Sequence, residues 1–102
     1  MKVRWHEEAL HEYGQLLAEA GERNALERAN IKKRVLETLR NLRDFPSMGR
    51  FNTEVECYEK YVPRTRVLLI YQLVEQHIRI IAAFHTSREP EEKPFERRHD
   101  EL

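Results

Sequence analysis

Two apolar runs separated by a short polar segment constrain the fold of this chain more than any other feature. Residues Val67–Val74 and Ile78–Phe84 are almost continuously apolar and rich in branched and aromatic side chains. Such runs favour β-strands, and the polar segment Glu75–His77 between them is short enough for a hairpin loop. The sequence therefore predicts a β-hairpin, and the rest of the chain has to cover it.

Two amphipathic helices are predicted before this hairpin. From about His6 to Ala20, apolar residues recur at spacings of three and four, with glutamates on the opposite side. Gly21 is expected to end this helix, and a second helix with its own apolar positions is predicted over Glu22–Arg43. Because the connection is short, the two helices should form an antiparallel pair that lies on one face of a sheet.

Short extended segments complete the predicted sheet. Lys2–Trp5 alternates and fits an N-terminal strand, and Val55–Val62 is rich in strand-forming residues. The connections among the last three strands are too short for crossovers, so these strands should form an antiparallel meander. We predict an α+β, two-layer fold: an N-terminal strand, an antiparallel helix hairpin, then an antiparallel three-stranded meander.

The charged C-terminus is expected to stand apart from this domain. A chain of 102 residues forms one domain, which we assign to residues 1–90, and residues 91–102 form a charged tail. The tail should be mobile unless Phe95 docks. Large apolar side chains stand at both odd and even positions of Val67–Val74, so they point to both faces of the strand. Two helices on one face could not bury all of them. They predict either an external partner on the sheet or the tail folding back over it.

Composition excludes several classes of function. The 18 basic and 18 acidic residues cancel, so no global field draws the chain to nucleic acid. Cys57 is the only cysteine, so no intrachain disulfide can form and a reducing compartment is expected. No stretch is long and apolar enough to cross a membrane and no signal peptide is recognisable, so we expect a cytoplasmic protein without a membrane partner.

No metal or other cofactor is expected. His6 and His11 are five residues apart, about 140° around a helix, whereas a metal-binding helix needs histidines four apart on one face. The basic residues of the second helix are interleaved with Glu27 and Glu37, which is more typical of a solvated face than of a phosphate-binding surface.

Polar residues gather at one rim of the predicted hairpin. With the turn near Glu75, counting outwards along both strands brings Arg66 opposite His85, with Arg64 just before it. By parity, His85 should share a face with Arg79, Ile81 and Ala83. His85 could act as a general acid or base while the arginines hold a phosphate. The alternative is that His85 only ends its strand and forms local hydrogen bonds.

The chain resembles the RelE/ParE superfamily of toxins from bacterial type II toxin–antitoxin systems. The resemblance covers about Val3–Pro90 and rests on the order of the predicted elements and on three segments, Leu39–Arg50, Leu68–His85 and His85–Pro90. The last segment resembles the histidine–x–x–arginine ending of the ParE-like branch. The resemblance implies a small toxin in a hetero-oligomer with a cognate antitoxin, whose C-terminal segment wraps the helices and the sheet.

The superfamily has two activities, and the resemblance leaves both open. RelE-like members cleave mRNA on the ribosome, with basic residues on the sheet orienting the RNA. For that activity the candidate catalytic residues here are His85, Arg66 and Arg64, and Glu54 is a candidate base. ParE-like members inhibit DNA gyrase and are not known as nucleases. In that case the residues expected to contact the target or the antitoxin are Arg88, His85 and Tyr71.

Two features favour the ParE-like branch. Thr86 follows His85, where some ribonuclease members have a tyrosine, and the chain is neutral, whereas ribosome-dependent members are usually strongly basic. We therefore predict a ParE-like inhibitor of DNA gyrase. The alternatives are a ribosome-dependent mRNA endonuclease and a toxin that only binds its antitoxin, so whether the chain is an enzyme stays open.

Overall fold

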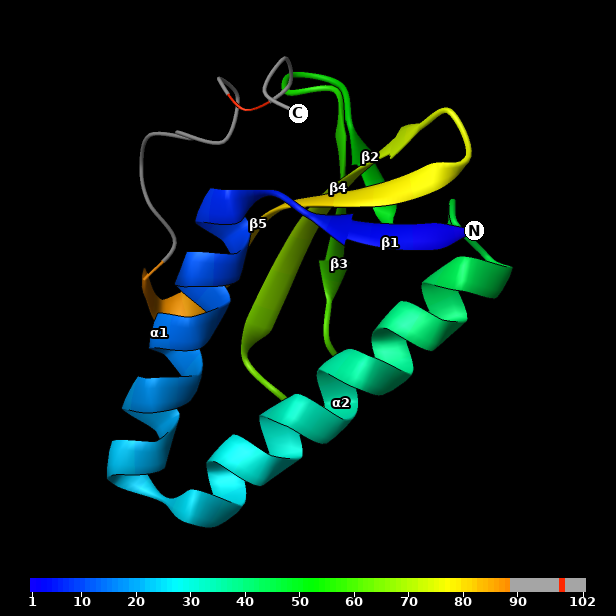
Figure 1. Ribbon diagram of the computed structural model, residues 1–102. Coiled ribbons are helices and arrows are strands. Elements are labelled where there is room, and N and C mark those ends of the chain that lie inside the picture. The colour runs from blue at the N-terminus through cyan, green and yellow to red at the C-terminus, as the bar shows by residue number, and fades with distance from the viewer. Residues whose placement is uncertain (89–97, 99–102) are drawn as a thin grey trace.

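The computed structural model describes residues 1–88 and Arg98. In chain order the elements are β1 (Lys2–Trp5), α1 (Glu7–Arg23), α2 (Ala25–Asp44), β2 (Arg50–Asn52), β3 (Cys57–Tyr61), β4 (Val67–Val74), β5 (His77–His85) and the short 3-10 helix η1 (Thr86–Arg88). The strands form one five-stranded sheet in the order β1-β5-β4-β3-β2 (Figure 1). The predicted α+β fold class is confirmed. The predictions made for the other residues of the tail lie outside the described part of the chain.

The two helices are joined at a single residue, Asn24. Its backbone N–H donates to the carbonyl of Ala20 at the end of α1, and its side chain accepts a 2.8 Å hydrogen bond from the N–H of Leu26 at the start of α2. The predicted helix end at Gly21 was wrong, because α1 continues to Arg23. A glycine within a helix costs only about 1 kcal/mol, whereas an asparagine cap satisfies amides that would otherwise lack a partner.

The sheet is mixed and contains one strand that the sequence did not predict. β1 is parallel to β5, and the pairs β5–β4, β4–β3 and β3–β2 are antiparallel. The predicted three-stranded meander is therefore extended by β2, which pairs with β3 and places Phe51 edge-on against Tyr58 at a centroid distance of 5.0 Å. A strand of three residues is too short to show an alternating pattern, which is why it was missed.

A β-bulge in β5 sets the direction of its C-terminal half. Ile70 pairs with Ala82 while the next residue, Tyr71, pairs with Ile80, so Ile81 is an extra residue in β5. The bulge reverses the predicted parity, because His85 now shares the helix-facing side of the sheet with Ala83 and Ile80 rather than with Arg79 and Ile81.

The register at the rim also differs from the predicted one. His85 lies opposite Val67, not opposite Arg66. The carbonyl of Arg66 instead accepts a 2.7 Å hydrogen bond from the N–H of Thr86. The turn at Glu75 and Gln76 lies where the sequence predicted it, so the extra residue at the bulge alone shifts the count by one, and a bulge leaves no signal in the sequence.

The core has two parts, one on each face of the sheet. The part between sheet and helices contains, among others, Leu16, Val35, Leu42, Val67, Leu69, Tyr71 and Ile80. The part on the opposite face contains Val55, Cys57, Leu68, Ile70, Ile81 and Ala82, with Leu68 and Ile70 only 1% exposed. Apolar residues are thus buried on both faces of β4.

Candidate functional site

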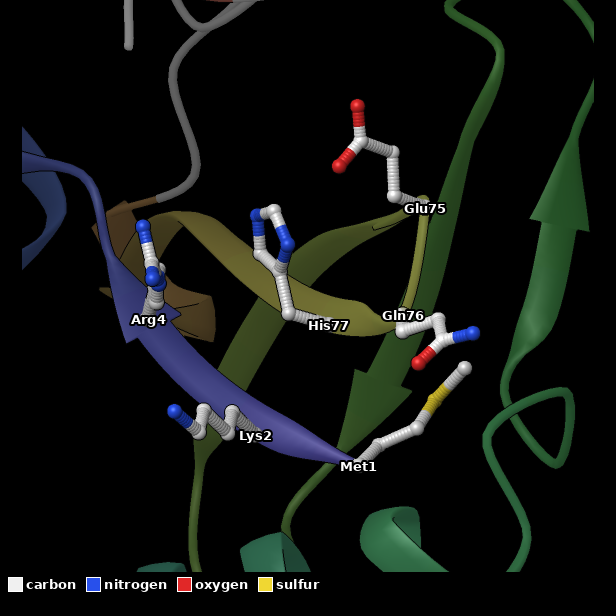
Figure 2. A pocket seen from close by; sticks show the side chains of 6 residues that line it. All are labelled: Met1, Lys2, Arg4, Glu75, Gln76 and His77. Atoms are coloured by element: carbon white, nitrogen blue, oxygen red, sulfur yellow. The ribbon is translucent and has the colours of Figure 1, made fainter.

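Two hollows lie at opposite ends of β5. One, with a volume of about 720 Å³, is formed by β1 and the β4–β5 turn at the His77 end (Figure 2). The other, of about 190 Å³, lies at the His85 end between the first turns of α2 and the β3–β4 turn. Its lining residues are Glu27, Asn30, Ile31, Arg64, Thr65, Arg66 and His85. The structure therefore brings the three candidate catalytic residues to one hollow, although their register differs from the predicted one.

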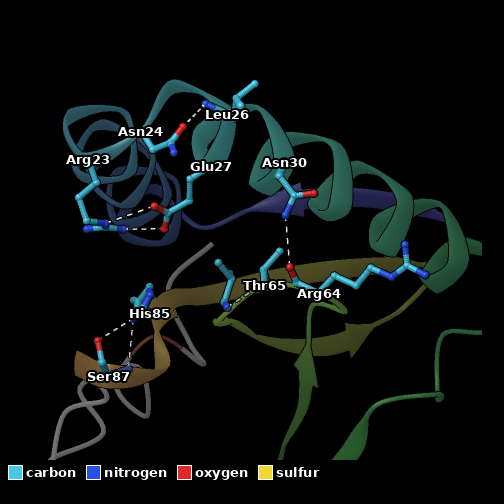
Figure 3. Close-up of polar contacts among 10 residues, drawn as sticks. Arg23, Asn24, Leu26, Glu27, Asn30, Arg64, Thr65, His85 and Ser87 are labelled. Atoms are coloured by element: carbon cyan, nitrogen blue, oxygen red, sulfur yellow. Dashed lines mark hydrogen bonds and ion pairs between the residues drawn. The ribbon is translucent and has the colours of Figure 1, made fainter.

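The β3–β4 turn at this hollow is fixed by side chains. Arg64 has a positive φ of 61°, and its carbonyl accepts a 3.2 Å hydrogen bond from the Asn30 side-chain amide (Figure 3). The Thr65 hydroxyl donates to the carbonyl of Val62 at 2.8 Å and accepts from the N–H of Val67 at 3.1 Å. The turn is therefore held from both α2 and its own backbone.

The two arginines are less organised than the turn that carries them. Arg64 and Arg66 are exposed, and neither forms a hydrogen bond or ion pair through its guanidinium with a residue that the structure describes. Figure 3 shows the Arg64 side chain extending away from His85. Only the backbone of Arg64 is held at the hollow, so its guanidinium is not aimed at a phosphate beside the imidazole.

The hydrogen bonds of His85 determine which ring nitrogen carries its proton. Its Nδ1 accepts a 3.2 Å hydrogen bond from the backbone N–H of Ser87 and lies 2.7 Å from the Ser87 hydroxyl (Figure 3). Because a backbone N–H can only donate, Nδ1 must carry a lone pair and the proton sits on Nε2. A proton on Nδ1 would break this hydrogen bond from Ser87.

The carboxylate at this hollow is committed to a neighbour on the helix hairpin. Glu27 receives two hydrogen bonds from Arg23, at 2.9 and 3.3 Å. The hydrogen bond from Arg23, together with the charge of its guanidinium, holds the pKa of Glu27 below its ordinary value. Glu27 is thus an ionised partner of Arg23 rather than a base poised to take a proton.

A family comparison decides the class of protein. A family model described as the ParE toxin of type II toxin–antitoxin system, parDE, matches residues 3–90. The chain belongs to the ParE toxin family. This family implies an antitoxin as partner. None of the curated proteins compared with this ParE-family chain matches it.

The remaining predicted site residues occupy different surroundings. Arg88 ends η1, and its side chain lies outside what the structure describes. Glu54 is exposed and does not line the His85 hollow. Tyr71 is fully buried, so it offers no surface for a partner in this ParE-family chain.

Tyr71 instead organises the loop between α2 and β2. Its hydroxyl donates to the carbonyl of Pro46 at 2.7 Å and accepts from the N–H of Gly49 at 3.0 Å, and its ring stacks on Tyr58. A Cβ at Gly49 would stand 2.7 Å from this hydroxyl, so the close approach requires glycine. Burial raises the pKa of Tyr71.

Three residues near His85 were not expected from the sequence. Asn30 and Glu27 belong to a helix whose polar side was predicted to face solvent. The only hint in the sequence was that Asn30 stands next to Ile31, an apolar residue that is buried. Glu12 of α1 joins the site from the other side, where its carboxylate accepts from the N–H of Ala83 at 3.2 Å. No local pattern marks Glu12, because its contact depends on how α1 docks on β5.

Glu12 also holds Arg98. Beyond Ile80, β1 no longer accompanies β5, and Arg98 donates to the carbonyl of Ile81 at 2.7 Å and to the Glu12 carboxylate at 3.0 and 3.3 Å. The carbonyl of Arg98 in turn accepts a 2.6 Å hydrogen bond from Arg79. Arg98 thereby satisfies part of the strand edge that β1 leaves open.

The described residues show neither a metal centre nor a membrane span. Among residues 1–88 and Arg98, no three His, Cys, Asp or Glu side chains are grouped so that they could hold a metal ion. Within the same residues, neither α1 nor α2 combines the length and the apolar character that crossing a bilayer requires.

Proposed function

We propose that this ParE-family toxin acts in the cytoplasm by inhibiting DNA gyrase and is neutralised by a cognate antitoxin. The antitoxin's C-terminal segment would wrap the helix pair and the sheet. In this proposal His85, Arg88 and the tail form the surface that contacts the target, and no bond is made or broken by the toxin.

The hydrogen bond from Ser87 to His85 carries this proposal. A general acid for RNA cleavage must donate a proton to the leaving oxygen, which an imidazolium does far better than a neutral ring. Ser87 keeps Nδ1 as an acceptor, the Arg64 guanidinium points away from His85, and Glu27 is bound to Arg23. These arrangements support a binding role better than a catalytic one.

A second candidate is a ribosome-dependent mRNA endonuclease. It is favoured by one observation, that Arg64, Arg66 and His85 line the same hollow. Arginine side chains are flexible, and substrate could draw both guanidiniums onto a phosphate while His85 exchanges its bond to Ser87 for a proton.

Pulse labelling after induction of the toxin without antitoxin separates these candidates. We expect thymidine incorporation to fall within minutes while methionine incorporation continues. A methionine collapse that comes first would overturn the gyrase proposal in favour of the ribonuclease. If neither falls, the chain is an inactive toxin, and its function reduces to binding its antitoxin.

The His85→Ala variant tests the role of the imidazole directly, with His11→Ala on the exposed side of α1 as matched control. A ribonuclease that loses its general acid should slow by about 100-fold or more. A gyrase inhibitor should retain its activity within a few-fold unless His85 is an interface anchor. Purified gyrase and supercoiled plasmid provide the readout, with mRNA cleavage on ribosomes measured in parallel.

A further inference from the structure

The His77 end of the sheet carries a group of cationic side chains that the proposed function does not use. β1 and β5 are parallel neighbours, with Lys2 paired to His77 and Arg4 paired to Arg79. Paired residues on neighbouring strands point to the same face, so all four lie on the face opposite the helices. We call Lys2 and Arg4 the cationic strip, since Arg79 is buried beneath the Arg98 contact.

The cationic strip borders an open hollow. Figure 2 shows Arg4, His77 and Glu75 rising from the same side of the sheet, with the imidazole between the guanidinium and the carboxylate in this view. Lys2 and Arg4 are exposed, and neither forms an ion pair or hydrogen bond through its side chain with any described residue. The Nε2 atom of His77 is shielded from solvent and has no hydrogen-bond partner among the described residues. The exposed side chains of Lys2 and Arg4 are therefore available to an anionic ligand.

β1 also presents a backbone edge that no described strand occupies. It is the last strand of the sheet, and β5 is its only strand neighbour among the described residues. His6 donates its N–H to the carbonyl of Ile80. Hydrogen-bonding direction alternates along a strand, so the amide groups of Lys2 and Arg4 also face β5, and those of Val3 and Trp5 face outwards. Such an edge is a template for one more strand.

We propose that the β1 edge and the cationic strip bind an extended acidic peptide as an additional strand of the sheet. Side chains on one face of a strand recur about every 6.6–6.8 Å, the spacing at which Lys2 and Arg4 stand. The peptide would therefore carry acidic residues at every second position, opposite Lys2 and Arg4, while its backbone bonds to Val3 and Trp5.

A nucleic acid fits this site less well than a peptide. Glu75 at the rim of the hollow would repel any polyanion, so the backbone edge and not the charge discriminates between the two ligands. A nucleic-acid backbone would leave the outward amides of β1 without their natural partners. The site lies at the opposite end of β5 from His85, so the inference does not depend on the proposed function.

Fluorescence anisotropy with the purified full chain tests the charge requirement. The probe is a labelled ten-residue peptide with glutamate at every second position and threonine or valine between. Arg4→Glu should weaken binding by about tenfold or more, since it replaces an attraction by a repulsion. Arg40→Glu, the same change at an exposed position of α2, should have less than about a twofold effect. Circular dichroism confirms that both variants are folded.

Backbone methylation of the peptide tests the added strand independently of charge. Methyl groups on alternate amides of one parity should abolish binding, and those on the other parity should be tolerated, because only one set faces β1. Equal effects of both parities, or equal affinity of Arg4→Glu and the unchanged chain, would overturn the proposal. It would also be overturned if a single-stranded oligonucleotide of ten nucleotides bound while the peptide did not.

Discussion

The two ends of β5 each carry a histidine, and their surroundings differ in almost every respect. At the C-terminal end, His85 is held by Ser87, and the adjoining turn and strand edge are tied to α2 by Asn30 and to α1 by Glu12. At the N-terminal end, His77 stands beside cationic side chains that have no described partner. The strand is nine residues long, and the two histidines are separated by an even number of positions.

The bulge at Ile81 accounts for this difference. In a regular strand both histidines would point to the same face. The extra residue turns His85 towards the helices and leaves His77 on the opposite side. One added residue thus allows a single strand to build a closed site at one end and an open one at the other.

The largest expected effect concerns the closed end. Glu12→Ala removes the acceptor for Ala83 and for Arg98 and leaves the guanidinium of Arg98, whose side chain is only 10% exposed, without its counter-charge. Breaking such a pair should lower the free energy of unfolding by about 3 kcal/mol. Urea denaturation measures this, with Gln15→Ala on the same helix as control. A loss below about 0.5 kcal/mol would mean that the closed end does not depend on Glu12.

A smaller effect is expected at the middle of the hairpin, where Tyr71 pairs with Ile80 next to the bulge. Tyr71→Phe removes one donor and one acceptor in the loop between α2 and β2. The expected cost is about 1–2 kcal/mol at neutral pH. The peptide affinity of the His77 end should not change, and a change would show that the two ends are coupled through the loop.

The same variant has a pH signature. Burial raises the pKa of Tyr71 above its ordinary value, so the unfolded chain ionises first as pH rises. The stabilisation that the protonated Tyr71 hydroxyl gives to the folded state is complete below about pH 10 and is lost as the pH rises through the pKa of the folded state. The free energy of unfolding of Tyr71→Phe should therefore fall less steeply above about pH 10 than that of the unchanged chain. Urea denaturation at several pH values measures both. Some slope should remain, because burial also raises the pKa of Tyr13. Equal slopes for both proteins would contradict this assignment.

The smallest effect is expected at the open end. Arg4→Ala should change the free energy of unfolding by less than about 0.5 kcal/mol, because the exposed side chain holds no described partner. Asn30→Ala, its counterpart at the closed end, should cost about 1 kcal/mol through the lost bond to the carbonyl of Arg64. Thermal and urea unfolding of both variants provide the comparison. If Arg4→Ala costs as much as Asn30→Ala, Arg4 has a structural role and is not reserved for a ligand.

The outline of the fold was predictable because it rests on patterns that the chain repeats. Apolar residues at helical spacing marked α1 and α2, and continuous apolar runs marked β4 and β5. The errors occurred where one residue decides between alternatives. Asn24 rather than Gly21 separates the helices, and the three residues of β2 are too few to form a pattern.

The candidate site was predicted in position but not in construction. Counting from the hairpin turn placed Arg66 opposite His85, one residue away from Val67, which is the observed partner. The error is this small because a short turn leaves little freedom of register. The face of His85 was predicted incorrectly, since a bulge depends on packing against neighbours. Glu12, Glu27 and Asn30 were missed for a related reason: their roles arise only when helices distant along the chain dock on the sheet.

Asn24 has a consequence for how this molecule moves. Because one residue closes the end of α1 with its backbone and opens α2 with its side chain, the helices share a terminus. Fraying of either helix at this corner removes a cap from the other, so the corner opens as one unit. Opening fluctuations at this corner should therefore involve both helices together.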